Sequence, residues 1–285
     1  MENAGLITLE YVNTVIKERP RDIHKGDCGK VLIIAGSVGM AGAAVLCARG
    51  ALRSGAGLVR ISAPEELYPI LQVGVPEATC IPRRLSLPEL QACDAVAVGP
   101  GLGDDSYNEE LIRTILKVYK RTVVLDADGI NAVSRFDLGQ ALRDTEADVI
   151  MTPHPGEAAR FLTYCGEEMS GRQERQRTAE LLVKYTDAVC ILKGHETLVA
   201  TREGKTYTNT TGNPGMAAGG SGDVLTGILT ALAGQGHSPE VCAKAGVFIH
   251  GLAGDLCAQK LGETGMTSMD LAQMTAFAFK QIIGK

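Results

Sequence analysis

The most constraining feature of this sequence is a series of short apolar runs, rich in Val and Ile, with longer helical patterns between them. The runs show little alternation of polar and apolar residues, which is typical of parallel strands covered on both faces. The helical patterns suit crossover connections. The sequence therefore predicts an α/β fold, a doubly wound and mostly parallel sheet between two helical layers. The expected strands are VLIIAG (31–36), LVRISA (58–63), DAVAVG (94–99), TVVLDAD (122–128), DVIMTP (148–153) and AVCILKG (188–194).

The pattern changes at residues 196–209, where polar and apolar residues alternate around REGK and predict a small antiparallel hairpin. After residue 222 the chain is expected to form three helices. No linker, low-complexity tract or repeat interrupts it, and 285 residues with 45% hydrophobic content are enough for one large core. We therefore expect a single domain over residues 1–285.

Charge and cysteine usage argue against several classes of function. The formal net charge is -5, from 28 basic and 33 acidic residues without the basic block typical of nucleic-acid binding. Eight cysteines lie mostly in apolar runs without a Cys-x-x-Cys pair, which favours buried thiols in a reducing compartment. We find no signal-peptide pattern and no run of 18 apolar residues. We expect a cytoplasmic protein with no nucleic-acid or membrane partner.

Ligands of doubly wound sheets bind beyond the carboxyl ends of the strands, and unusual residues follow the expected strands here. GSVGMAGAA (36–44) is a glycine loop entering a helix, where exposed N–H groups favour an anion; a tight turn is the alternative. GPGLGDD (99–105) is a turn whose position draws attention to Gly103. VLDADGINA places Asp126, Asp128 and Asn131 at a strand end. Helix capping accounts for Asp128, which makes Asp126 the more suggestive carboxylate.

Two further stretches carry charged side chains at strand ends. In MTPHPGEAARF (151–161) two prolines flank His154, and Glu157 falls in the first helical turn, where a carboxylate could orient Mg²⁺ through water. The alternative is a turn histidine followed by an ordinary first-turn acid. In LKGHETLV (192–199) Lys193 emerges beside a glycine and could reach a nucleotide phosphate; the alternative is a solvated lysine. No spacing of His, Cys and acids predicts a metal site built by protein alone.

The glycine-rich stretch NTTGNPGMAAGGSGDVLTGIL (209–229) is the most informative. Its glycines allow consecutive N–H groups to point at one spot at a helix start, which suits a transferring phosphoryl group. Asp223, in the first turn of that helix, would take the proton of the acceptor hydroxyl. The alternative is a flexible connection followed by a favourable first-turn charge.

These motifs together resemble a known family. AGGSGDVLTGIL looks like the anion hole and catalytic aspartate of the ribokinase-like superfamily, whose fold is a three-layer sandwich. In combination with VGPGLG, VLDADGINA, TPHPGE and LKGHETLV, it resembles the ADP-dependent NAD(P)H-hydrate dehydratases over about residues 24–283. The resemblance implies a repair reaction on the S epimer of hydrated NADH or NADPH. ADP, or ATP, phosphorylates the C6 hydroxyl, and phosphate then leaves, giving NAD(P)H, AMP and phosphate.

The resemblance also implies roles for individual residues. Ala43, Gly103 and His154 match positions that line the hydrated nicotinamide nucleotide, and Asp223 matches the base. Mg²⁺ is expected with the nucleotide, its protein ligands unknown apart from a water-mediated contact to Glu157. The positions implied for ADP are Lys193, Gly194, His195, Glu196 and Thr197 at the strand end, and Gly219, Gly220, Ser221 and Gly222 in the phosphate loop.

One departure concerns the fused epimerase domain that precedes this one in many bacterial relatives. Here only some 23 residues precede the HKGDCG motif, so we expect dehydration without epimerisation. Relatives of the stand-alone type are often homotetramers, which is implied here too. Two alternatives stay open: a small-molecule kinase of the hydroxymethylpyrimidine or hydroxyethylthiazole type, and a nucleotide-binding sensor without catalysis.

Overall fold

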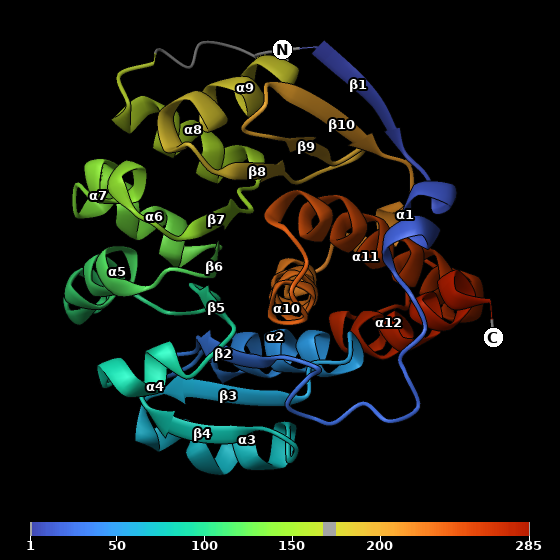
Figure 1. The fold of residues 1–285 in the computed structure, drawn as a ribbon, viewed down its shortest axis with the longest axis horizontal. Helices are drawn as coiled ribbons and strands as arrows, with labels where there is room; N and C mark the ends of the chain where they lie inside the picture. The colour runs from blue at the N-terminus through green and yellow to red at the C-terminus, as the bar shows by residue number, and fades with distance from the viewer. Residues whose placement is uncertain (1, 168–174, 285) are drawn as a thin grey trace.

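The computed structural model describes residues 2–167 and 175–284 and contains one ten-stranded sheet. The strands run in the order β1-β10-β9-β8-β7-β6-β5-β2-β3-β4 (Figure 1). All neighbouring pairs are parallel except those of β9, which is antiparallel to β8 and to β10. The strands are β1 (Glu2–Ile7), β2 (Lys30–Ile34), β3 (Leu58–Ala63), β4 (Thr79–Pro82), β5 (Ala95–Val98), β6 (Thr122–Leu125), β7 (Asp148–Met151), β8 (Val189–Leu192), β9 (Leu198–Ala200) and β10 (Lys205–Asn209).

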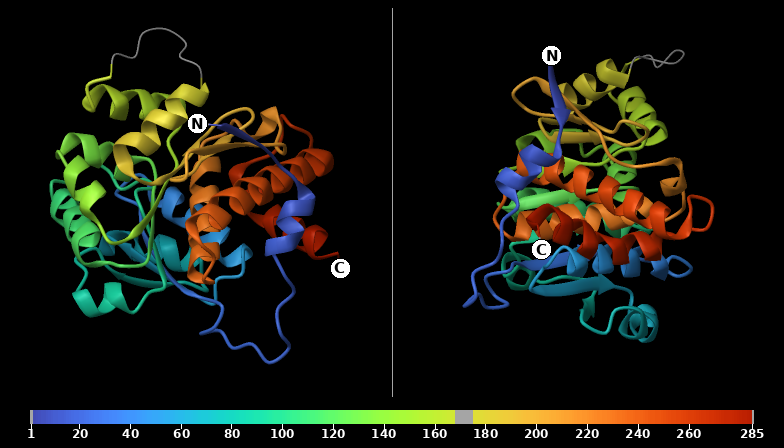
Figure 2. Two further views of the ribbon diagram at one scale, coloured as in Figure 1. Left: turned by 45° about the horizontal axis from the view of Figure 1, so that its top comes forward. Right: turned by 90° about the vertical axis from the view of Figure 1, so that its right-hand side faces the viewer.

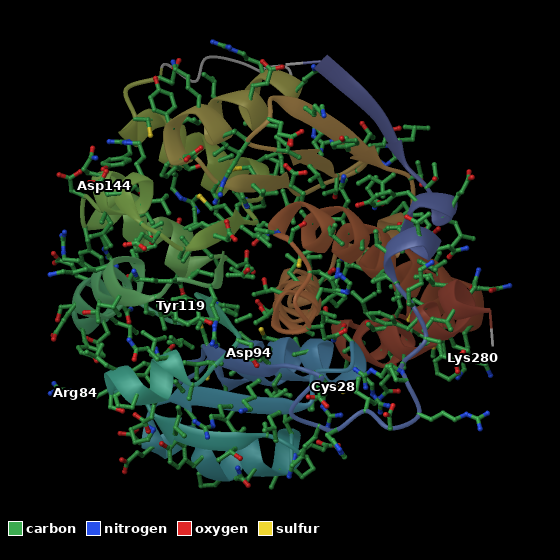
Figure 3. The ribbon with its side chains drawn as sticks, in the orientation of Figure 1. Cys28, Arg84, Asp94, Tyr119, Asp144 and Lys280 are labelled. Atoms are coloured by element: carbon green, nitrogen blue, oxygen red, sulfur yellow. The ribbon has the colours of Figure 1, made fainter. Side chains whose placement is uncertain are left out.

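Helices cover both faces of the sheet, which confirms the predicted α/β class. The helices are α1 (Leu9–Val15), α2 (Ala41–Arg53), α3 (Tyr68–Gly74), α4 (Leu87–Gln91), α5 (Tyr107–Val118), α6 (Asp128–Arg135), α7 (Gly139–Asp144), α8 (Pro155–Tyr164), α9 (Arg175–Thr186), α10 (Ser221–Gly234), α11 (Pro239–Leu261) and α12 (Ser268–Ile283), with short 3₁₀ turns at Glu65–Leu67 and Pro214–Met216. In Figure 3 the labelled residues Asp144, on α7, and Lys280, on α12, lie on opposite sides of the molecule.

The continuous apolar runs are explained by two separate cores, one on each face of the sheet. Along β2, Val31 and Ile33 pack into the core under α2, α10, α11 and α12, while Leu32 and Ile34 pack into the core under α5 to α9. A strand buried on both faces has no polar side, which is why its sequence does not alternate.

All six predicted strands form, and the hairpin is present as β9 and β10. Two strands were not predicted, β4 and the first strand, β1, which lies along the edge of the sheet beside β10 (Figure 2). Six cysteines are buried and Cys80 and Cys165 are partly exposed; all eight are free thiols.

Helix α11 is long and apolar enough to cross a membrane by length and composition alone. However, 61% of its apolar window is buried inside the molecule, where the helix packs against α10 and α12. Its hydrophobic residues are therefore accounted for by the core.

Candidate active site

The candidate site lies at the carboxyl ends of β2, β5, β6, β7 and β8, as the sequence predicted. The strand order reverses between β2 and β5, because later strands add on one side of this pair and β3 and β4 on the other. The loops that leave β2 and β5 therefore diverge, and such a switch point is where doubly wound sheets bind ligands.

The two glycine loops at this switch point are in contact. A Cβ placed on Gly101 would lie 2.9 Å from Cβ of Ala43, and one on Gly103 would lie 3.1 Å from Oγ of Ser37. Both glycines have positive φ, 56° and 76°, so neither position favours another residue. The structure thus brings together Ala43 and the Gly103 loop, two of the three positions implied for the substrate.

Asp128 does not cap helix α6, contrary to the sequence interpretation. The cap residue is Ala127, which has no side-chain capping bond, and Asp128 is the first helical residue. Its Oδ2 instead accepts a hydrogen bond of 2.9 Å from the backbone N–H of Gly103. Asp128 therefore holds the glycine loop after β5.

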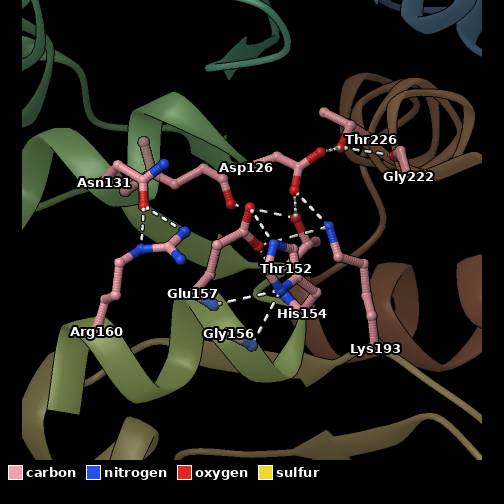
Figure 4. A network of polar contacts seen from close by, with 11 residues as sticks. Asp126, Asn131, Thr152, His154, Gly156, Glu157, Arg160, Lys193, Gly222 and Thr226 are labelled. Carbon is pink, nitrogen blue, oxygen red and sulfur yellow. Dashed lines mark hydrogen bonds and ion pairs between the residues drawn. The ribbon is translucent and has the colours of Figure 1, made fainter. Parts of the chain in front are cut away.

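Asp126, 1% exposed, is the centre of a polar network (Figure 4). Its Oδ1 accepts hydrogen bonds from Nζ of Lys193 and from Oγ1 of Thr152, both at 2.8 Å. Its Oδ2 accepts one of 2.7 Å from Oγ1 of Thr226. A buried carboxylate is costly unless it is paired and hydrogen-bonded, and here three donors satisfy it.

Lys193 points inward and not into solvent, so the solvated-lysine alternative is wrong. Its side chain is 20% exposed, and Nζ lies 2.8 Å from Asp126 and 3.9 Å from Oε2 of Glu157. A Cβ placed on Gly222 would lie 3.2 Å from the same Nζ. Burial by itself lowers the pKa of Lys193, but Asp126 and Glu157 more than offset it, so its pKa is raised and the side chain is a cation at neutral pH.

The start of helix α10 is shaped as a site for an anion. Its cap residue, Gly220, has φ of 91° and offers no side-chain hydrogen bond to the helix. The N–H groups of the first helical turn, those of Gly222 and Asp223 included, have no partner within the helix. Together with the helix dipole and Nζ of Lys193 they form a group of donors suited to an anion.

Two side chains from the last helices fix this loop from behind. Oγ of Ser268 donates a 2.7 Å hydrogen bond to the carbonyl of Gly219. Nε2 of His250 lies 2.9 Å from the carbonyl of Ser221 and 3.4 Å from its Oγ. Burial lowers the pKa of His250 to about 4, so the ring is neutral and its N–H donates to that carbonyl. The Ser221 side chain therefore faces His250.

Asp223 lies in the first turn of α10, next to these donors, and is partly buried. Burial, and next the negative charge of Asp126, raise the pKa of Asp223 to about 7, although Lys193 acts in the opposite direction. Within residues 2–167 and 175–284 no hydrogen bond or ion pair engages this carboxylate. A group with this pKa and a free carboxylate is suited to accept a proton near neutral pH.

His154 and Glu157 form a capping box at the start of helix α8. Nδ1 of His154 accepts from the N–H groups of Gly156 and Glu157, at 3.0 and 3.3 Å, and the N–H of His154 donates to Oε2 of Glu157 at 2.8 Å. Nε2 of the ring lies 3.2 Å from Oε1 of the same carboxylate. This geometry is that of a turn histidine followed by a first-turn acid, the alternative interpretation of the sequence. A contact between His154 and the substrate stays a prediction.

A metal held by protein alone is not supported. No group of three or more His, Cys, Asp or Glu side chains within the described ranges could hold a metal ion. Glu157 is 5% exposed, with both oxygens near His154, and Asp126 is saturated by its donors. This donor set fits a divalent ion that is carried by nucleotide phosphates and reached from the protein through water.

The residues after Lys193 form an exposed turn between β8 and β9. Gly194 has φ of 137° and Glu196, unusually for a non-glycine residue, φ of 53°. Oγ1 of Thr197 donates to the carbonyl of Gly194 at 2.9 Å. Arg175, at the start of α9, donates to the carbonyls of His195 and Leu192. Of the positions implied for ADP, Lys193 therefore points into the molecule, whereas the turn that follows it lies at the surface.

Sequence reasoning missed several residues of this site: Thr152, Arg175, Thr226, His250 and Ser268. Thr226 was within reach of a sequence argument, because it lies one helical turn after Gly222 on the face that carries the glycine. The others become neighbours only through packing of distant segments, which no local pattern records.

Comparisons with known proteins identify a family for this chain. The family model for NAD(P)H-hydrate dehydratase matches residues 31–276. The chain is 34% identical to the ADP-dependent (S)-NAD(P)H-hydrate dehydratase of Listeria monocytogenes over 89% of each protein. It also matches the bifunctional NAD(P)H-hydrate repair enzyme of Moorella thermoacetica, at 35% identity over 98% of this chain and 54% of that protein. The chain thus spans about half the length of the bifunctional relatives it matches.

The fold has close counterparts among solved structures. The ADP/ATP-dependent NAD(P)H-hydrate dehydratase of Bacillus subtilis, co-crystallised with ATP and Mg²⁺, has a TM-score of 0.84 at 28% identity, covering 99% of this chain and 100% of the other. A ribokinase-like superfamily protein of Enterococcus faecalis has a TM-score of 0.83 at 25% identity, covering 99% and 96%. The three-layer sandwich is therefore the ribokinase-like fold.

Proposed function

The chain belongs to the NAD(P)H-hydrate dehydratase family, and we propose that it dehydrates the S epimer of hydrated NADH or NADPH at the expense of ADP. The products would be NAD(P)H, AMP and phosphate. The observation that carries this proposal is the placement of Asp223, a free carboxylate with a pKa of about 7, beside the unpaired N–H groups of α10 and opposite Lys193.

Phosphoryl transfer comes first in this mechanism. The terminal phosphoryl group of ADP would lie at the start of α10, where the N–H groups and Nζ of Lys193 stabilise its charge. Asp223 takes the proton of the C6 hydroxyl as that oxygen bonds to phosphorus, and the bond to the AMP oxygen breaks. Positioning and charge stabilisation supply most of the catalysis of such transfers, so the few groups present are sufficient.

Elimination follows at the same group of donors. Phosphate is a far better leaving group than hydroxide, and it departs from C6 with its bonding electrons. A proton leaves the neighbouring ring carbon, C5, for the departing phosphate, and the electrons of that C–H bond form the double bond of NAD(P)H. The same N–H groups and Lys193 stabilise the charge on the departing phosphate. A Mg²⁺ ion bound to the nucleotide would neutralise phosphate charge. A water-mediated contact to Glu157 is proposed with it, and this buried carboxylate would have to leave its contacts with His154 to reach the water shell.

Ala43, Gly103 and His154 are proposed contacts of the hydrated nicotinamide nucleotide, and the Gly194–Thr197 turn is a proposed contact of ADP. We also propose a homotetramer in the cytoplasm, in which the eight free thiols would remain reduced. The proposal extends to ATP as the phosphoryl donor, because the Bacillus subtilis relative is described as ADP/ATP-dependent.

The test is the Asp223→Asn variant, which keeps the shape of the side chain and removes its basicity. We expect ADP binding, measured by calorimetry, to stay near the wild-type value. Turnover of the S hydrate, followed as recovered absorbance near 340 nm, should fall by roughly three orders of magnitude. Near-normal turnover in this variant would remove the base assignment.

A further inference from the structure

A cavity of about 380 Å³ shares Gly103 with the candidate active site. It opens between helices α5, α6 and α8 and falls in the size range of small-molecule sites. Its lining combines charged and polar side chains with the glycine loop after β5, and the residues the argument uses are Gly103, Asp104, Asp128, Asn131, Arg135 and Arg160.

The cavity is continuous with the positions proposed for substrate. Gly103 belongs to both, and Asp128 links them by holding the N–H of Gly103. On the other side, Arg160 lies on α8, the helix that His154 caps. A ligand that contacts Gly103 and His154 and extends beyond one nucleotide would therefore enter this cavity.

Among the described residues, Arg160 is the arginine of the cavity lining that forms no ion pair, and Asp128 is a carboxylate of the same lining. Arg135 is paired with Asp104 at 2.5 Å, and Asp128 accepts from a backbone N–H. Arg160 donates from Nε and Nη2 to the amide oxygen of Asn131, at 3.3 and 3.1 Å (Figure 4). No carboxylate in the described part of the chain forms an ion pair with this guanidinium.

The amide of Asn131 orients Arg160 without neutralising it. A guanidinium has five N–H donors, and this contact leaves the remaining ones free. A planar and oriented guanidinium outside any ion pair is suited to a phosphate group, which it can bind through two parallel hydrogen bonds.

We propose that this cavity binds the adenylate half of the dinucleotide substrate and that Arg160 contacts one of its phosphates. The proposal rests on the proposed function for the identity of the ligand as a dinucleotide. In this proposal Arg160 recognises the part of the substrate that does not react. Arg160 therefore increases the affinity for dinucleotides and not the affinity for mononucleotides.

The test compares the binding of NADP⁺, NAD⁺ and nicotinamide mononucleotide to the wild-type protein and to Arg160→Met by calorimetry. We expect the variant to bind NADP⁺ about tenfold more weakly, the scale of a lost charge-assisted hydrogen bond. Mononucleotide binding should change much less. A loss for both dinucleotides assigns the contact to the pyrophosphate, and a loss for NADP⁺ alone assigns it to the 2′-phosphate; either supports the proposal.

The matched control is Arg113→Met, which removes an arginine from the exposed pair with Glu109 on α5. It should bind all three ligands as the wild type does. Unchanged NADP⁺ affinity in Arg160→Met, or an equal loss for the mononucleotide, would overturn the proposal. Because these measurements need no turnover, failure of the wild type to dehydrate the hydrate would count against the proposed function alone.

Discussion

At the scale of single residues, Asp126 links the proposed base to the proposed phosphate site. Its carboxylate holds Lys193 beside Gly222, and its negative charge is, after burial, the main reason that the pKa of Asp223 is raised. We assign Asp126 to positioning, because its three donors leave it no evident contact with a reacting group.

The pH dependence of the rate tests this role. Asp223 must be ionised to act as a base, so kcat/KM should rise with pH and level off above about 7. Asp126→Asn removes a neighbouring negative charge and lowers the pKa of Asp223, which should shift the acidic limb to lower pH while turnover falls. The control, Thr226→Val, removes a hydrogen bond to Asp126 but keeps the charge of Asp126. The acidic limb of its pH profile should stay near pH 7. The same limb in Asp126→Asn and wild type would contradict the assignment.

The reason for which the sequence interpretation favoured Asp126 over Asp128 was wrong. That interpretation treated Asp128 as a helix cap, whereas Asp128 holds the Gly103 loop. It identified Lys193 by its place at a strand end, and it could not show that Nζ turns toward α10, since that depends on the packing of a helix 30 residues further along the chain.

At the scale of elements, the glycines at the start of α10 serve different purposes. Gly220 is needed for its backbone, because φ is 91° and a Cβ there would lie 2.3 Å from Cδ1 of Leu46. Gly222 has ordinary helical geometry, and its missing side chain leaves room next to Nζ of Lys193.

Alanine variants should separate the two purposes. Gly222→Ala gains helix propensity of about 1 kcal/mol, so its Tm should be unchanged or higher. Its Cβ, 3.2 Å from Nζ of Lys193, would crowd the phosphate site, and turnover should fall about tenfold or more. Gly220→Ala should lose stability as well, as measured by thermal unfolding. Full activity in Gly222→Ala would contradict a phosphate site at this point.

The first strand was missed because residues 2–7 are short and contain Asn and Gly, which are depleted in strands. In the structure β1 gains its stability from pairing with β10 and from Ile7, which is 1% exposed and whose carbonyl accepts from Oγ1 of Thr210. Tertiary pairing thus overrides a weak local preference.

Deletion of residues 2–7 should weaken the nucleotide side of the site. It leaves one edge of β10 unpaired, and β9 and β10 follow directly on the turn proposed to contact ADP. We expect a Tm lower by several degrees and a KM for ADP higher by a few fold, with KM for the hydrate changed less. An unchanged Tm and KM would show that β1 does not support the hairpin.

At the scale of the whole molecule, the order of the strands places the proposed donor and acceptor sites on one edge of one sheet. The acceptor loops follow β2 and β5 at the switch point, the Lys193 turn follows β8, and α10 delivers Asp223 from one of the helical layers. Because one sheet carries all these parts, we propose that residues 1–285 fold as a single domain. The apolar runs predicted most of this sheet, while its order and the approach of α10 follow from packing.

In an ordinary kinase of the same fold phosphate stays on the acceptor, whereas the proposed reaction releases it. The most direct measurement is the stoichiometry of products when the wild-type protein turns over the S hydrate of NADPH with ADP. We predict AMP, phosphate and NADPH in equal amounts. Accumulation of a phosphorylated dinucleotide without recovery of NADPH, or recovery of NADPH without formation of AMP, would contradict the proposed mechanism.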